Sequence, residues 1–237
     1  MIHVAGVVNA ADRAGFMIGN VEGTKAIVTT ASQAGLRRFI HVSSLAAREP
    51  ELSTYGWSKA EAERAVMASG LDWAIVRPPA IYGPGDLEMR ELFRLARHGL
   101  AFTPPAGRLS VIEVSDLGRL LLALMERDAA GYVIEADDGQ PGGWTHAAFA
   151  KAVGQAVGRD VRPIALPRPL LSLLARIDRL IRGKRARLTP DRVAYFCHAD
   201  WVIDTTRRPD PATWQPSIST PEGLAATAAW YRAHSLL

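Results

Sequence analysis

The chain has 237 residues, of which 48% are hydrophobic, enough to form one sizeable domain or one domain with a small lobe. The formal net charge of +4 is a modest basic excess, so we expect no nucleic-acid partner. One cysteine excludes an internal disulfide and suits a reducing compartment, and no signal peptide or membrane-spanning run is recognisable, so we expect a cytoplasmic protein.

The first part of the chain predicts a strand, a long helix and a second strand. Residues 1–5 are apolar and β-prone, and residues 12–35 carry apolar side chains at helical spacing with a break expected among their glycines. A short apolar run at residues 37–42 predicts a buried strand, which Ser43 and Ser44 close.

Residues 54–69 are predicted to form a helix that carries a Tyr–Lys pair. Tyr55 and Lys59 are four residues apart, a spacing that places both side chains on one helix face. An ammonium beside a phenol favours the phenolate, which predicts a lowered pKa for Tyr55 and proton exchange with a substrate hydroxyl. The Ser44 hydroxyl would polarise the same substrate oxygen. The same spacing also occurs on solvated helix faces, but ligands bind beyond the carboxyl ends of strands in open α/β sheets, where Ser44 falls.

The remaining sequence continues with strands and helices. A Pro- and Gly-rich loop is expected at residues 77–86, and Ser115 with Asp116 is expected to cap a helix. Further strands are predicted at residues 73–76, 109–114, 131–136 and 161–166. Further helices are predicted at residues 88–99, 115–127, 145–157, 168–187, 189–197 and from residue 220 onward.

Five motifs, in chain order, resemble the extended short-chain dehydrogenase/reductases, which include NAD-dependent epimerase/dehydratases and 3β-hydroxysteroid-dehydrogenase-like enzymes. They are residues 3–6 (HVAG), 20–24 (NVEGT), 39–44 (FIHVSS), 55–59 (YGWSK) and 77–86 (RPPAIYGPGD). The resemblance covers nearly all of the chain and is densest up to about residue 130. It implies an NAD(P)-dependent oxidoreductase or epimerase that acts on a carbon bearing a hydroxyl or carbonyl.

The resemblance also implies roles for individual residues. Tyr55 would be the general acid/base, Lys59 would lower its pKa and bind the nicotinamide ribose, and Ser44 would orient and polarise the substrate oxygen. Asn20 would have a structural or proton-relay role, the alternative being a polar residue on an exposed turn. The cofactor, NAD or NADP, would lie along Ala5, Gly6, Asn20, Val42, Ser43, Tyr55, Lys59, Pro78, Ala80 and Ile81. The small-molecule substrate would contact Leu45, Tyr82 and Arg108, the last through a phosphate as in nucleotide-sugar enzymes, and no metal site is expected.

The strand at residues 1–5 corresponds to the fourth strand of the family's dinucleotide-binding sheet. The resemblance therefore implies an α/β fold with an incomplete Rossmann-like parallel sheet that lacks its first three strands, and a small, mostly helical C-terminal substrate lobe. Residues 1–77 would form the truncated core, and residues 78–237 the interleaved core elements and lobe. Because the G-x-x-G-x-x-G phosphate loop belongs to the missing part, we expect weak or no NAD(P) binding. The alternative function is a non-catalytic fragment or a binding or assembly protein that kept the fold without the cofactor.

Residues 168–187 combine helical apolar spacing with seven Lys and Arg residues against the single acidic Asp178. Two interpretations are open: a helix lying on an anionic membrane surface, or a substrate-lobe helix with a solvated basic face, which we favour. The resemblance implies dimerisation through the helices at residues 12–35 and 54–69, so apolar surface there would favour a homodimer. The choice between NAD and NADP and the identity of the substrate are not determined by this sequence.

Overall fold

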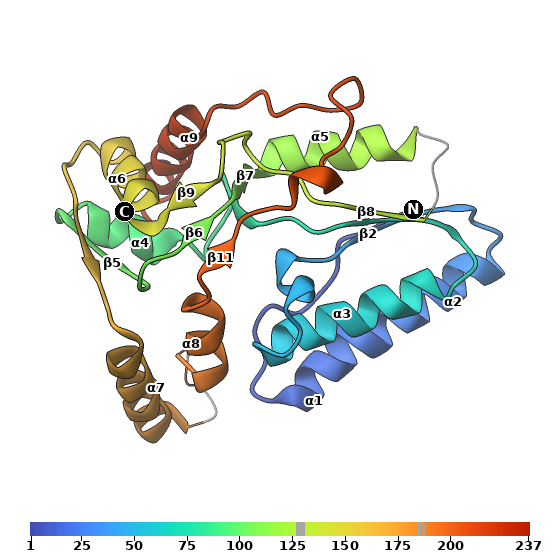
Figure 1. The fold of residues 1–237 in the computed structure, drawn as a ribbon, viewed down its shortest axis with the longest axis horizontal. Coiled ribbons are helices and arrows are strands. Elements are labelled where there is room, and N and C mark those ends of the chain that lie inside the picture. Colours follow the sequence, from blue (N-terminus) through green and yellow to red (C-terminus); the bar gives the residue numbers. More distant parts are fainter. Residues whose placement is uncertain (127–130, 184–185, 187) are drawn as a thin grey trace.

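The centre of the computed structural model, which describes all residues except 127–130, 184–185 and 187, is a parallel sheet (Figure 1). In this described part the sheet has the strand order β1-β2-β3-β8, and each neighbouring pair is parallel. Its strands are β1 (Ile2–His3), β2 (Arg38–Val42), β3 (Asp72–Val76) and β8 (Tyr132–Ile134). This confirms the α/β class with a parallel sheet, whereas the expectation of an incomplete sheet that lacks its first three strands is not confirmed, because the described residues form a four-stranded parallel sheet.

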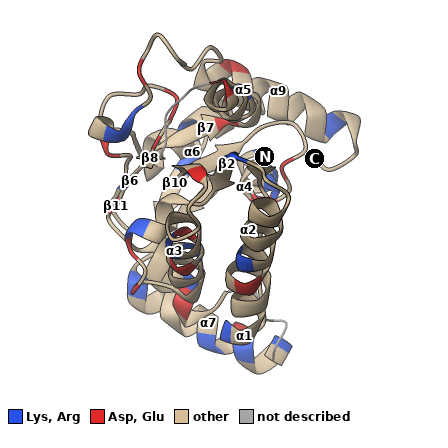
Figure 2. Ribbon diagram, turned by 90° about the vertical axis from the view of Figure 1, so that its right-hand side faces the viewer, with Lys and Arg blue, Asp and Glu red and all other residues tan. Residues whose placement is uncertain are grey.

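Helices cover both faces of this sheet. Helices α2 (Gly23–Gln33) and α3 (Thr54–Met67) lie side by side on one face, and α5 (Val114–Met125) lies on the other (Figures 1 and 2). Successive side chains of a strand point to opposite faces. Phe39 therefore packs with α2 and α3, while the next residue, Ile40, packs in the cluster that contains α5. Burial on both faces explains why apolar residues predominate in these strands.

The helix predicted at residues 12–35 is confirmed, and its centre is irregular. It consists of α1 (Arg13–Phe16), the π-helical η1 (Met17–Glu22) and α2. The Asp12 carboxylate caps its start by accepting a hydrogen bond from the Gly15 amide at 3.0 Å. At Gly19 a Cβ atom would lie only 2.3 Å from the Val7 side chain, so a glycine is needed where the loop after β1 crosses the helix.

The second half of the chain adds β8 and α5 to the main sheet and forms a lobe beside it. Its residues in regular elements are mostly helical, with several short strand pairs between the helices. Its strands pair as β4 (Ala80–Tyr82) with β7 (Val111–Glu113), β5 (Leu100–Thr103) with β10 (Arg162–Ala165), and β6 (Arg108–Leu109) with both β9 (Trp144–Thr145) and β11 (Asp200–Trp201). Its helices are α4 (Arg90–Ala96), α6 (His146–Ala156), α7 (Arg168–Arg182), α8 (Pro190–Phe196) and α9 (Thr220–Ala233).

Two local expectations differ from the structure near residues 109–116. The predicted strand is divided because its partner changes at Ser110: the Ser110 amide donates to Trp201, whereas Val111 pairs with β4. The cap of α5 is Glu113 and not Ser115 with Asp116, because the Glu113 carboxylate accepts hydrogen bonds from the amides of both those residues, at 2.6 and 3.2 Å. A side chain two to three residues earlier than expected therefore fixes the start of the helix.

Partners and location are not decided by the fold. Among the helices that the structure describes, none combines the length and the hydropathy needed to cross a bilayer. The homodimer and the cytoplasmic location remain predictions.

Candidate active site

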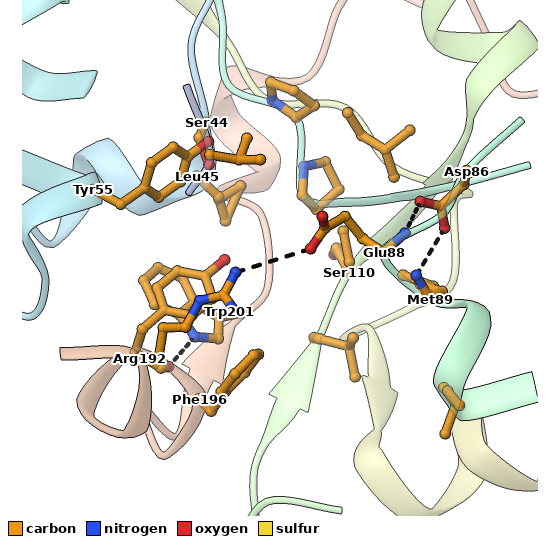
Figure 3. A pocket seen from close by; sticks show the side chains of 18 of the residues that line it. Ser44, Leu45, Tyr55, Asp86, Glu88, Met89, Ser110, Arg192, Phe196 and Trp201 are labelled. Carbon is orange, nitrogen blue, oxygen red and sulfur yellow. Dashed lines mark hydrogen bonds and ion pairs between the residues drawn. The ribbon is translucent and has the colours of Figure 1, made fainter. Parts of the chain in front are cut away.

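Ser44 and Tyr55 face each other at the carboxyl end of β2 (Figure 3). Ser44 caps the short 3₁₀ helix η2 (Leu45–Arg48), and Ser53 caps α3 by accepting a hydrogen bond from the Gly56 amide at 3.0 Å. A Cβ atom at Gly56 would lie 2.6 Å from the Ala46 carbonyl oxygen, so this glycine lets α3 begin directly against η2. The two caps and the close contact place Tyr55 in the first turn of α3, opposite the end of β2.

The Tyr55 phenol is less acidic than the sequence predicts. Burial raises its pKa above the usual 10, and a hydrogen bond with the Ser44 hydroxyl acts in the opposite direction. The Lys59 amine donates a hydrogen bond to the carbonyl oxygen of Val42 at 2.9 Å. The prediction of a lowered Tyr55 pKa is therefore wrong for this structure, because desolvation of the phenolate outweighs the stabilising contact.

Lys59 is a buried ammonium one helical turn behind Tyr55. Desolvation lowers its pKa to about 8, and the nearby Glu63 carboxylate opposes that shift. Because the lowered value still lies above neutral pH, the amine remains mostly protonated there. It lies beneath an exposed backbone segment, since a Cβ atom at Gly6 would be 3.6 Å from its Nζ atom.

Asn20 ties the loop after β1 to α3. Its side chain is buried in η1, and its amide nitrogen donates to the Val7 carbonyl and to the Ser58 hydroxyl, both at 2.9 Å. Its amide oxygen accepts from the Val7 amide at 2.6 Å. The interpretation of Asn20 as a polar residue on an exposed turn is therefore wrong, and the contacts give it a structural role.

A cavity of about 890 Å³ opens in front of Ser44 and Tyr55. Residues from both halves of the chain line it, and most of them are apolar, including Phe16, Leu45, Leu92, Phe102, Phe149, Tyr195, Phe196 and Trp201. Of the predicted site residues, the lining includes Ser43, Ser44, Leu45, Tyr55, Pro78, Ala80 and Ile81. The carboxyl ends of the strands, the start of α3 and the lobe thus line one cavity.

Two predicted substrate residues are not among the described residues that line this cavity. Tyr82 is fully buried under α9, where its ring packs against Phe149 and burial raises its pKa to about 12. The Arg108 guanidinium donates hydrogen bonds to the carbonyl oxygens of Gly142 and Gly143. Backbone carbonyls therefore engage the group that was expected to hold a phosphate.

Polar contacts that the sequence did not predict cross the cavity. Arg192 of α8 lies 3.9 Å from the Glu88 carboxylate, on opposite sides of the lining (Figure 3). Asn9 donates to Glu88 at 3.3 Å and accepts a hydrogen bond from Arg192. Asn9 and Arg192 are separated by 183 positions, so no local pattern could have indicated this contact.

Two histidines lie beneath Lys59 on the α2 and α3 face of the sheet. The rings of His3 and His41 are stacked, with centroids 5.3 Å apart, and His3 contacts the Thr24 hydroxyl at 3.2 Å. His41 is fully buried, and neither ring nitrogen has a hydrogen-bond partner among the described residues. Burial has the largest effect and lowers the His41 pKa well below its usual 6.5, and the charges of Lys59 and His3 act in the same direction.

The His41→Leu variant is expected to lose less stability in acid than the wild type does. Because the His41 pKa is lower in the folded than in the unfolded chain, the unfolded chain binds more protons below pH 6.5, and stability falls as the pH drops through that range. Urea unfolding at a series of pH values measures how steeply the free energy of unfolding changes with pH, and this slope should be shallower for His41→Leu. His234→Gln, at an exposed histidine, is the control. Equal slopes for wild type and His41→Leu would show that His41 does not carry the acid sensitivity.

The chain matches, over residues 3–126, the profile of a protein family described as NAD(P)H-binding. It belongs to this NAD(P)H-binding family, and its cofactor is accordingly NAD or NADP. A curated relative, the ceramide reductase of Caulobacter vibrioides, is 36% identical over 241 residues, which cover 98% of this chain and 74% of the relative.

Solved structures share the fold at low sequence identity. The human epimerase family protein SDR39U1 with NADPH superposes with a TM-score of 0.73 at 18% identity, covering 96% of this chain and 81% of that one. MoeE5 in complex with UDP-glucose and NAD has a TM-score of 0.70 at 19% identity, covering 99% of this chain and 79% of that one. The chain thus shares its fold with proteins whose structures contain NADPH or NAD.

Proposed function

We propose that this chain is an oxidoreductase of the extended short-chain type, in which Ser44, Tyr55 and Lys59 act on a substrate carbonyl or hydroxyl. The observation that carries the proposal is the pairing of two hydroxyls at the inner wall of the cavity. Ser44 and Tyr55 meet there, at the carboxyl end of a central parallel strand, with a buried ammonium behind them. This is the end of a parallel sheet at which ligands bind in open α/β folds.

The residues around Lys59 fit the nicotinamide half of the cofactor. Ala5 and Gly6 are small and exposed, and the Ser43 hydroxyl is buried without a hydrogen-bond partner among the described residues. Lys59 would hold the ribose hydroxyls from beneath this segment, and Pro78, Ala80 and Ile81 would border the ring. When bound, the nicotinamide supplies or accepts the hydride.

The protonation state of Tyr55 favours the reductive direction. Because burial raises its pKa, the phenol carries its proton at neutral pH and can give that proton to a substrate oxygen. The Ser44 hydroxyl would stabilise the negative charge that develops on that oxygen. The ammonium of Lys59 would limit the cost of leaving a phenolate behind.

The cavity wall favours a substrate with a long apolar part over a nucleotide sugar. Aromatic and aliphatic side chains dominate the lining, and the Arg108 guanidinium donates to backbone carbonyls instead of facing the cavity. The name of the Caulobacter relative, a ceramide reductase, supports the same class. We therefore propose a lipid-like ketone as the substrate.

Turnover of two substrate classes tests this proposal. We expect NADH or NADPH to be consumed with a long-chain keto amide in detergent, and no comparable reaction of NAD or NADP with UDP-glucose. Absorbance of the reduced nicotinamide measures both reactions. Cofactor binding without reaction of either class would instead support the non-catalytic alternative.

Cofactor binding is expected to depend on Lys59. The Lys59→Met variant should bind NAD(P)H about ten- to a hundredfold more weakly than the wild type, because hydrogen bonds from a charged donor contribute roughly 1.5–3 kcal/mol. Nicotinamide fluorescence titration measures both affinities. Lys25→Met removes an exposed lysine of α2 and should leave binding unchanged. An unchanged affinity in Lys59→Met would rule out its role in holding the cofactor.

A further inference from the structure

Helix α7 turns its apolar face to the solvent. Its exposed apolar side chains include Leu180 at 85% and Ile181 at 76%, and the others are Leu170, Leu173, Leu174 and Ile177. At 100° per residue these six side chains fall within about one third of the helix circumference. The sequence favoured a helix with its basic face solvated, yet here a continuous apolar stripe is solvated as well.

The opposite side of α7 attaches the helix to the rest of the protein. Within α7, all of whose residues are described, Ala175 is the buried residue, and α7 packs against α8. The polar face of α7 is basic, because it carries four arginines against one acidic residue: Arg168, Arg176, Arg179, Arg182 and Asp178. An exposed apolar face combined with an arginine-rich polar face is typical of helices that lie in the plane of a membrane interface.

We propose that α7 docks this protein on the surface of an anionic lipid bilayer. In that position Leu180, Ile181 and their neighbours would enter the boundary between headgroups and acyl chains, and the arginines of the polar face would be attracted to the anionic headgroups. Charge favours this occupant over a second copy of the chain. Two such helices packed along their apolar faces would each carry four arginines against one aspartate and would repel each other, whereas an anionic membrane complements the charge.

The position of α7 links this docking face to the cavity. Helix α8, on which α7 packs, contributes Arg192, Tyr195 and Phe196 to the cavity lining. Phe196 and Phe102 line the cavity and are also exposed, so apolar surface continues from the cavity to the outside next to α8. Both views place α7 and α1 at the same end of the molecule, where Figure 2 shows basic residues on both helices. A docked molecule would thus hold its cavity near the membrane from which a lipid substrate would come. Only this link between docking and substrate rests on the proposed function.

Co-sedimentation with vesicles tests the docking. The whole chain should bind vesicles that contain phosphatidylglycerol, bind pure phosphatidylcholine vesicles much more weakly, and lose affinity as salt is added. The Leu180→Gln/Ile181→Gln variant should bind at least about tenfold more weakly, since it removes the two most exposed apolar side chains of the stripe. Arg176→Gln/Arg179→Gln should also bind at least about tenfold more weakly and show less salt dependence.

A matched control separates the α7 stripe from apolar exposure in general. Ile18 and Leu122 are 69% and 64% exposed on other helices, and Ile18→Gln/Leu122→Gln should bind vesicles as the wild type does. Wild type that stays in the supernatant, or an equal loss in the control variant, would overturn the proposal. So would a dimer in sedimentation velocity that Leu180→Gln/Ile181→Gln dissociates, because a second copy would then cover the stripe. Vesicle binding without ketone reduction would count against the proposed function and leave the docking intact.

Discussion

The Tyr55→Phe variant is expected to lose turnover by about 10²–10⁴-fold, the usual contribution of a positioned acid or base. The change removes the phenolic proton and the hydrogen bond with Ser44 but keeps the ring that packs near Phe16. NAD(P)H affinity should stay close to that of the wild type, because Lys59 donates to Val42 independently of the phenol. Steady-state oxidation of NAD(P)H with a long-chain ketone, together with fluorescence titration of the cofactor, measures both quantities.

Two further variants sharpen this result. Ser44→Ala should reduce turnover less than Tyr55→Phe, and the double variant should resemble Tyr55→Phe alone, because residues that act as one unit are not additive. Tyr132→Phe removes a phenol that contacts Arg38 on the sheet, away from the cavity, and should leave turnover unchanged. Wild-type turnover in Tyr55→Phe would remove Tyr55 from the proton-transfer step.

The Arg77→Met variant is expected to lose about 3–5 kcal/mol of unfolding free energy, because it leaves the buried Glu63 carboxylate without its arginine partner and leaves Glu135 with only Arg48 as an ion-pair partner among the described residues. The Arg77 guanidinium donates to both oxygens of Glu63, at 2.8 and 2.6 Å, and lies 3.6 Å from Glu135. Glu63 and Glu135 are both buried, and they belong to α3 and to the end of β8. Urea unfolding at pH 7 measures the loss.

An exposed ion pair provides the comparison for Arg77. Arg94→Met breaks a pair with Glu91 on the surface of α4 and should cost less than about 1 kcal/mol. The double variant Arg77→Met/Glu63→Met should recover part of the loss, since it removes one of the uncompensated charges together with its partner. A loss for Arg77→Met no larger than that for Arg94→Met would show that Glu63 and Glu135 find other partners.

Local features of the sequence were sufficient to predict most of the elements. The apolar run at residues 37–42 became β2, and the helix with Tyr55 and Lys59 became α3, because strand burial and helix periodicity depend on neighbours within a few residues. The same reasoning placed Ser44 at the end of a strand facing Tyr55. It failed at residues 109–114, where a change of strand partner divided the expected strand.

The environment of each site group could not be predicted in the same way. The direction of the Tyr55 pKa shift depends on how deeply the phenol is buried, and the role of Arg108 depends on carbonyl groups more than thirty positions away. Likewise, Asn9, Glu88 and Arg192 meet across the cavity only because the lobe packs beside the sheet. None of these contacts corresponds to a periodic pattern in the sequence, so none could be predicted from one.

By itself, the sequence determined the class of fold and the identity of the candidate reacting groups, because both follow from short-range spacing and from side-chain chemistry. The tertiary structure decided which groups share the cavity, which of them hydrogen-bond the backbone instead, and which face of α7 meets the solvent. Those outcomes depend on which distant segments the chain brings into contact and on how far packing excludes water from each side chain. Neither can be read from the residue type at a single position.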